Sequence, residues 1–451
     1  MHDIVWRGGT VVTPLSVRTA DVAIAGERIA AIGADLEGEI VFDAAGLLVF
    51  PGVIDAHTHM DLPVSGTRSS DDFHSGTVAG ACGGVTTIVD FTVGTPDSSI
   101  PDEVERRLAA AADSVIDYAL HAEVIGWGPE KGWEFREAVR RGVTSFKFYT
   151  AYEASGRRTP PEILRRAFEA LAELGAVALV HCEDEGLIRS IMQGFTSEEM
   201  GRMATLAVAR PDLCEQTAIF QVGRLALETG CSTHIVHVSS ALGLAAVRAA
   251  RVQGARLTAE TCPQYLVLTA DSYERMDGHL FAASPPLRTV DDQRFLWTGL
   301  RQHELDLIAT DHCPFTREQK RWCGTFIDLP YGLPGVETLL PLLYSEGVAK
   351  GVLQVTDLPR LLSEGPARVY GLGPRKGGIE VGSDADLAIF DPDATWDISA
   401  ADLHMNTDFS PYEGWRVTGK VVATVSRGDV IYADGEISAD RGRGHFLVRN
   451  L

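Results

Sequence analysis

The middle of the chain, from Val53 to about Gly371, alternates short apolar β runs with amphipathic helical stretches such as Asp102–Ala112, Pro161–Leu174 and Ala241–Val252. This alternation is typical of parallel α/β folds. The eight β runs are Val53–His57, Val85–Phe91, Val115–Val124, Ser145–Tyr149, Val177–His181, Thr233–Val238, Arg256–Thr261 and Leu305–Thr310. Eight such units predict a (β/α)8 TIM barrel whose functional site lies at the carboxyl ends of the strands.

The two ends of the chain differ from the middle and share one character. Short strands and turns fill the first fifty residues, for example Asp21–Ile24, and similar material returns at Asp386–Phe390 and Lys420–Val425. We therefore expect a small β-sandwich domain made of residues 1–50 and 376–451, beside a barrel domain of residues 51–375.

Composition narrows the class of partner. The net charge is −22, from 40 basic and 62 acidic residues, which argues against nucleic acid and anionic membranes as partners. The sequence contains no apolar run of about 20 residues and no signal-peptide pattern. None of the seven cysteines forms a C-x-x-C motif, so we expect a cytoplasmic protein without a disulfide framework.

Two histidines, His57 and His59, end the first β run. Residues two apart in a strand point to the same face, so both imidazoles could reach one metal ion. The same spacing suits any two histidines on a half-exposed strand. The pair alone therefore leaves a metal site and a plain surface pair about equally open.

Four other β runs carry polar residues at corresponding positions, namely Lys147, His181, His237 and Asp311. Taken singly, each has an ordinary explanation: a hydrogen-bonded core histidine, an ion-paired lysine, or a helix-capping aspartate. Strand ends of a barrel converge on one mouth, however, so six such residues at five strand ends favour a metal centre. His234 has the opposite strand parity to His237 and is expected to face away.

Several motifs together carry a resemblance that spans the chain. They are Pro51–His59, Gly66-Thr67, Asp71–Phe73, Gly83–Phe91, Cys262–Leu266, Ser284–Arg288, Thr310–Phe315 and Gly382–Leu387. The combination resembles the cyclic amidohydrolases of the amidohydrolase superfamily, and is most similar to the D-hydantoinase and dihydropyrimidinase group.

The resemblance implies two divalent cations, expected to be zinc, with manganese or another metal as the alternative. Lys147 would be an N6-carboxylysine whose carbamate bridges the two metals. The other implied ligands are His57, His59 and Asp311 for one metal, and His181 and His237 for the other. Carboxylation would turn a buried amine into an anionic oxygen ligand suited to zinc.

The same resemblance implies hydrolysis of a cyclic amide by a bridging hydroxide, which would give N-carbamoyl amino acids. Asp311 would move the proton to the leaving nitrogen, and Tyr152 would stabilise the oxyanion. A packed tyrosine with a satisfied hydroxyl is the alternative for Tyr152.

The substrate contacts implied for the group are Ser284 and Tyr331 at the ring, and Leu62, Val64 and Tyr149 at its substituent. The group usually has Asn where Tyr331 stands, Phe where Tyr149 stands, and Asn where Asp184 stands. The physiological ring and the D or L preference therefore stay open.

Two alternatives remain beside a hydantoinase. Allantoinase, or another cyclic ureide hydrolase, fits most of the motifs, whereas a dihydroorotase would have an Arg within Met60–Val64. A non-catalytic scaffold relative would have lost metal ligands, and all six are present here. We expect a small cyclic ureide or imide substrate and, by analogy, a homo-oligomer that is a tetramer or dimer.

Overall fold

The computed structural model describes residues 1–450, and its central feature is a barrel of eight parallel strands. In order around the barrel these are β6 (Val53–Thr58), β9 (Val85–Phe91), β10 (Asp117–Glu123), β11 (Ser145–Tyr149), β12 (Val177–His181), β13 (Ser232–Ile235), β14 (Leu257–Thr261) and β15 (Leu307–Ile308). A parallel bridge between Thr58 and His312 joins β6 to the segment after β15. The sheet therefore curls into a nearly closed barrel, which confirms the predicted architecture.

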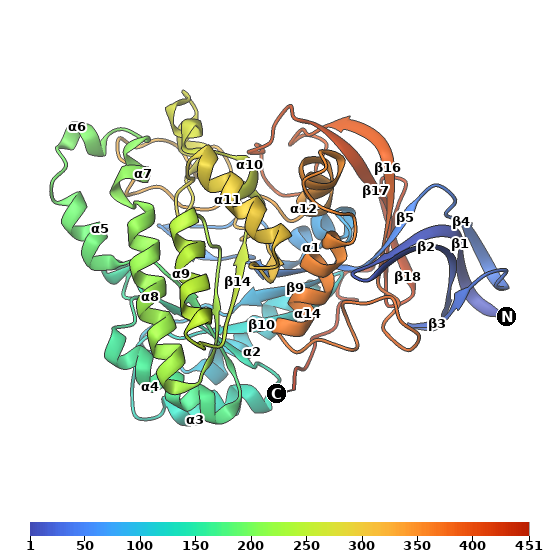
Figure 1. Ribbon diagram of the computed structural model, residues 1–451, viewed down its shortest axis with the longest axis horizontal. Coiled ribbons are helices and arrows are strands. Elements are labelled where there is room, and N and C mark those ends of the chain that lie inside the picture. The colour runs from blue at the N-terminus through green and yellow to red at the C-terminus, as the bar shows by residue number, and fades with distance from the viewer. Residues whose placement is uncertain (451) are drawn as a thin grey trace.

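Helices surround this barrel (Figure 1). The longer ones are α1 (Phe73–Cys82), α2 (Ile100–Ala110), α3 (Lys131–Arg140), α4 (Pro161–Leu174), α5 (Glu185–Met192), α8 (Asp212–Thr229), α9 (Ala241–Val252) and α11 (Val290–Arg301). Helices α4 and α9 have the bounds predicted from the sequence. Pro161 begins α4 and Gly175, with φ 71°, ends it, as expected for a helix start and a left-handed cap.

Shorter helical pieces complete the connections. They are α6 (Ser197–Met200), α7 (Thr205–Ala209), α10 (Pro263–Val267), α12 (Leu339–Leu343), α13 (Asp357–Pro359) and α14 (Gly365–Val369), the 3-10 turns η1 (Ala111–Asp113), η2 (Glu153–Ser155), η3 (Ala270–Glu274) and η4 (Gly278–Phe281), and the π turns η5 (Tyr344–Ala349) and η6 (Arg360–Glu364). Within residues 1–450, no helix combines the length and apolar character needed to cross a bilayer.

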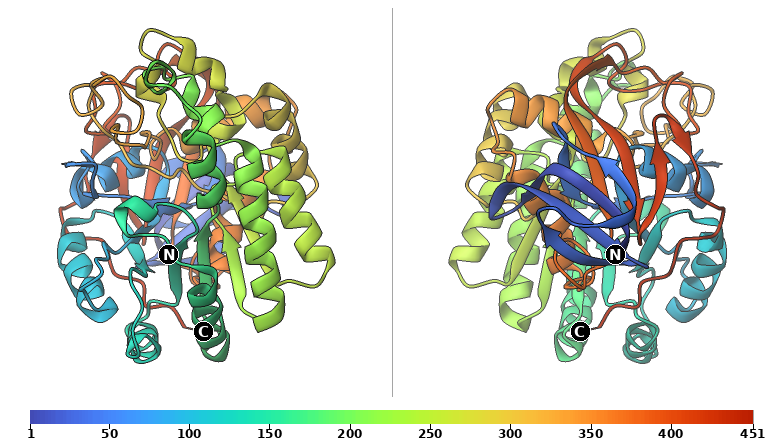
Figure 2. Two further views of the ribbon diagram at one scale, coloured as in Figure 1. Left: turned by 90° about the vertical axis from the view of Figure 1, so that its left-hand side faces the viewer. Right: turned by 90° about the vertical axis from the view of Figure 1, so that its right-hand side faces the viewer.

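Strands from the two ends of the chain share a separate nine-stranded sheet. They are β1 (His2–Thr13), β2 (Ser16–Ala25), β3 (Arg28–Gly33), β4 (Gly38–Asp43), β5 (Leu48–Pro51), β16 (Leu387–Asp397), β17 (Arg416–Ser426), β18 (Asp429–Ala433) and β19 (Glu436–Ile437). Because β5 pairs antiparallel with β16, the amino- and carboxyl-terminal strands lie side by side beside the barrel (Figure 2). The composite β domain is thus confirmed, while its exact limits stay a prediction.

The barrel interior is filled by side chains. Ile54, Val89, Leu179 and Leu307 point inward from four strands and form one buried cluster. A small hairpin of β7 (Pro63–Val64) and β8 (Thr67–Arg68) follows β6 at the open end. This arrangement leaves the strand ends and the loops after them to build a site.

Candidate active site

All six predicted metal ligands line one cavity of about 780 Å³ at the carboxyl end of the barrel. The six are His57, His59, Lys147, His181, His237 and Asp311. The predicted substrate contacts line the same cavity, namely Leu62, Val64, Tyr149, Tyr152, Ser284 and Tyr331. The structure therefore brings every site residue predicted from the sequence into one place, although their roles stay predictions.

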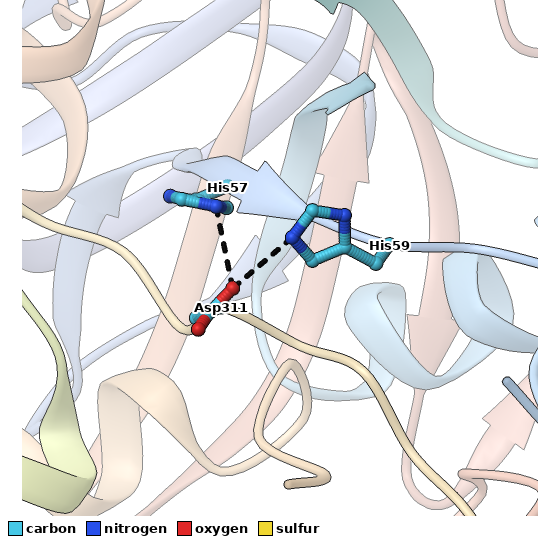
Figure 3. Close-up of side chains that lie close together, drawn as sticks. All are labelled: His57, His59 and Asp311. Atoms are coloured by element: carbon cyan, nitrogen blue, oxygen red, sulfur yellow. Dashed lines mark hydrogen bonds and ion pairs between the residues drawn. The ribbon is translucent and has the colours of Figure 1, made fainter. Parts of the chain in front are cut away.

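His57, His59 and Asp311 form one tight group. The Nε2 atoms of the two imidazoles lie 3.2 and 3.1 Å from Oδ1 of Asp311, and Figure 3 shows both rings turned toward this carboxylate. The contact of His57 lacks hydrogen-bond geometry, so its Nε2, like Nδ1 of His59, is a buried nitrogen without a hydrogen-bond partner among residues 1–450. Buried nitrogens are rarely left unpaired, and a divalent cation beside Asp311 would use the lone pair of His57 Nε2.

His181 and His237 form a second group beside the first. Nδ1 of His181 lies 3.0 Å from Nε2 of His237. Burial lowers the pKa of both histidines, as it does for His57, so each imidazole is neutral near pH 7. A neutral imidazole is the form that binds a metal.

Lys147 is 1% exposed and lies close enough to His57, His181 and His237 to lower the pKa of each. It forms no ion pair within residues 1–450, and its Nζ lies 5.2 Å from the ring centroids of Phe91 and Tyr149. Burial lowers the pKa of Lys147 to about 8, because removing the ammonium from water outweighs the attraction of Asp311 and Glu260. An unpaired amine of this kind can react with carbon dioxide, so the residues fit a carbamate that holds two divalent cations.

Glu260, on β14, is a site residue that the sequence reading missed. Its Oε1 lies 2.6 Å from Nδ1 of His57, and its Oε2 lies 3.1 Å from Nε2 of His234. The carboxylate thus turns Nε2 of His57 toward the cavity, as carboxylates commonly do for metal-binding histidines. The sign of this residue in the sequence was a carboxylate within the predicted β run Arg256–Thr261.

The prediction that His234 faces away is wrong. His234 is fully buried and packs against Tyr370, which belongs to the cluster inside the barrel. Strand alternation does not relate His234 to His237, because β13 ends at Ile235 and His237 adopts φ 41°. Strand alternation does not extend past the end of the strand, so both histidines reach the interior.

Glu183 and Arg210, which the sequence also did not predict, support His181. Oε2 of Glu183 lies 2.8 Å from Nε2 of His181, and Nε of Arg210 donates to Oε1 of Glu183 at 3.0 Å. Burial raises the pKa of Glu183, but the Arg210 guanidinium and His181 together outweigh this effect and hold that pKa well below its usual range. The ionised carboxylate leaves Nδ1 of His181 directed to the metal-binding side.

The hydroxyl of Tyr152 faces the cavity rather than a packed core. It lies 2.5 Å from Oγ of Ser284, and burial raises the pKa of Tyr152 to about 12, so it stays a hydrogen-bond donor at neutral pH. The hydroxyl of Tyr331 instead donates to the carbonyl of Phe326 at 2.9 Å. The side chain of Tyr331 is therefore engaged within its own loop.

Comparison with known proteins agrees with this geometry. The model of the amidohydrolase family matches residues 48–431. A D-phenylhydantoinase of Escherichia coli O1:K1 / APEC is 38% identical over 451 residues, covering 98% of this chain and 97% of that protein.

Two solved structures have nearly the same fold over their full length. A dihydropyrimidinase from Brevibacillus agri NCHU1002 superposes with a TM-score of 0.96 at 35% identity, covering 99% of this chain and 98% of the other. A D-hydantoinase from a Bacillus sp. AR9 gives a TM-score of 0.96 at 36% identity and covers 99% of each chain.

Proposed function

Because this chain belongs to the amidohydrolase family, we propose that it hydrolyses the cyclic amide bond of hydantoins or dihydropyrimidines to give N-carbamoyl amino acids. The observation that carries this proposal is the convergence of six predicted ligands on one cavity, where the buried Nε2 of His57 has no hydrogen-bond partner in residues 1–450. The relatives supply the substrate class.

The residues fit two divalent cations, expected to be zinc. His57, His59, Asp311, His181, His237 and a carboxylated Lys147 would hold them. When bound, the cations supply a hydroxide at neutral pH and polarise the ring carbonyl.

The protein's own groups then orient the ring and move the proton. Asp311 Oδ accepts the proton of the attacking hydroxide and delivers it to the leaving ring nitrogen. The Tyr152 hydroxyl donates to the carbonyl oxygen as negative charge develops there. Ser284 and the backbone of the Tyr331 segment hold the ring.

Two further properties belong to this proposal. We infer a homo-oligomer, a tetramer or dimer, from the family resemblance. A cytoplasmic location is inferred from seven cysteines that are all free in the structure.

The test is to measure ureido-product formation and bound metal on the natively purified protein. Dihydrouracil, a 5-substituted hydantoin, allantoin and dihydroorotate are supplied in parallel. We expect dihydrouracil or the hydantoin to be hydrolysed fastest. Activity should disappear after chelation, and zinc or manganese with bicarbonate should restore it.

Other results would contradict the proposal in distinct ways. Preference for allantoin would move the assignment to another ureide hydrolase. Bound metal without turnover of any ring would mean that the substrate class is wrong. Near-zero bound metal would favour a non-catalytic relative.

A further inference from the structure

One wall of the active-site cavity, beside the predicted substituent contact Tyr149, is polar. It is built on Glu123, a buried residue at the end of β10. Oε1 of Glu123 accepts hydrogen bonds from the Tyr149 hydroxyl at 2.7 Å and from Nε of Arg157 at 3.2 Å. Its Oε2 accepts from the backbone N–H of Gly94 at 2.7 Å. The carboxylate is therefore satisfied by the protein itself and is not left to bind substrate.

Arg157 is anchored at one edge only. Its Nε is held by Glu123, and within residues 1–450 its two Nη atoms make no hydrogen bond. The side chain is 24% exposed and lines the cavity. Its backbone N–H donates to the carbonyl of Tyr152 at 3.2 Å, so the guanidinium belongs to the same short segment as the proposed oxyanion donor.

The other two arginines of the cavity are already engaged through Nη atoms. Nη1 of Arg189 lies 3.0 Å from Glu153, and Nη2 of Arg210 pairs with Glu183. Among these three arginines, Arg157 thus has two Nη donors without a hydrogen-bond partner in residues 1–450. Such a fork matches the two oxygens of a carboxylate and binds it more strongly than a neutral amide.

We infer that Arg157 is a specificity residue that binds a carboxylate on the substituent of the substrate ring. Leu62 and Val64 line the same cavity and provide apolar surface for a short methylene chain before that carboxylate. The preferred substrates are then ring ureides with a carboxyalkyl group. This inference rests on the proposed function, because it names the substrate class of the same site.

The experiment compares kcat/KM of the metal-replete enzyme for 5-(2-carboxyethyl)hydantoin and for its neutral isostere, 5-(2-carbamoylethyl)hydantoin. We expect the wild-type enzyme to favour the acid by about tenfold, since a charge-assisted pair replaces a neutral hydrogen bond. Arg157→Gln should bring the ratio to about one, and Arg157→Lys should restore part of it.

Arg158→Gln is the matched control. Arg158 is the next residue, pairs with Glu153 at 3.2 Å, and is not part of the cavity lining, so its variant should keep the wild-type ratio. Metal content and the unfolding midpoint of Arg157→Gln verify that it is folded.

Two results would overturn the inference. A wild-type ratio of one or less would mean that the free guanidinium edge selects no carboxylate. An equal loss for both substrates in folded Arg157→Gln would mean that Arg157 only supports the wall through Glu123. Unsubstituted hydantoin and dihydrouracil separate the two proposals. Turnover of either ring without a preference for the acid overturns only this inference, whereas no turnover of any ring overturns the proposed function and this inference with it.

Discussion

At the scale of single residues, the site uses backbone conformations that side chains rarely adopt. Tyr152, His237 and Asp311 have φ of 71°, 41° and 55°, in the left-handed region. For a residue other than glycine this costs about 1 kcal/mol or more, and such strain concentrates at functional sites. The conformations turn these side chains into the cavity where a regular strand would not.

Replacing Tyr152 by Phe should lower kcat about a hundredfold, because the variant loses the proposed hydroxyl donor to the developing oxyanion. Metal content should stay at the wild-type value, since Tyr152 is not among the proposed ligands. The measurement is steady-state kinetics on the best substrate together with metal analysis. Loss of bound metal would instead indicate a structural role, through the packing of its ring 4.8 Å from that of His181.

At the scale of elements, the loops that carry substrate contacts are joined by one buried amine. Lys320 is fully buried, and its Nζ donates to the carbonyls of Leu280 and Ala282 at 2.9 and 3.0 Å. The backbone N–H of Gly332 also donates to Ala282 at 3.0 Å. The segment before Ser284 is therefore held against the loop that contains Tyr331.

Lys320 should make stability depend on pH. Burial lowers the pKa of Lys320 to about 7 from its ordinary 10.5, so the unfolded chain binds more protons between those two values. Stability therefore rises as the pH increases from 7 toward 10.5. Urea denaturation midpoints between about pH 6.5 and 9.5 should show a smaller rise for Lys320→Met than for the wild type.

Lys350→Met is the control for this experiment, because Lys350 is 60% exposed and pairs with Glu346 on the surface. Its urea denaturation midpoint should rise with pH as steeply as that of the wild type. Equal slopes for the wild type and Lys320→Met would show that the buried amine does not titrate in this range.

At the scale of the whole molecule, the last residues return to the barrel and cover its amino-terminal end. Phe446 forms a parallel bridge with Tyr118, and Leu447 joins the cluster inside the barrel. Arg449 is 1% exposed and donates to Oγ of Ser145 at 2.9 Å and to the carbonyl of Leu120. The segment that contains Arg449 therefore packs against the start of β11, on which Lys147 follows Ser145 by two residues.

Arg449→Ala should lower the free energy of unfolding by about 3 kcal/mol, because it leaves a buried hydroxyl and a buried carbonyl without their donor. Urea unfolding measures the change. The control is Arg441→Ala, which removes an exposed pair with Asp113 and should leave the midpoint unchanged. Equal effects of both variants would mean that the tail is not part of the cooperative fold.

Much of the architecture could be predicted because it depends on neighbours in the sequence. Alternation of apolar runs predicted eight strands, and helical periodicity predicted the bounds of α4 and α9. Residue type at the strand ends was enough to select the six candidate ligands, because parallel strands of a barrel end at a common mouth.

The tertiary structure alone decided which groups support those residues. Glu260 orients His57 from 203 positions away, and Arg157 presents its free edge because Glu123, 34 positions earlier, holds the other. Local sterics and periodicity act over a few residues, whereas these contacts depend on which strands and loops pack together. For the same reason strand parity failed at His237, where the chain had already left the strand.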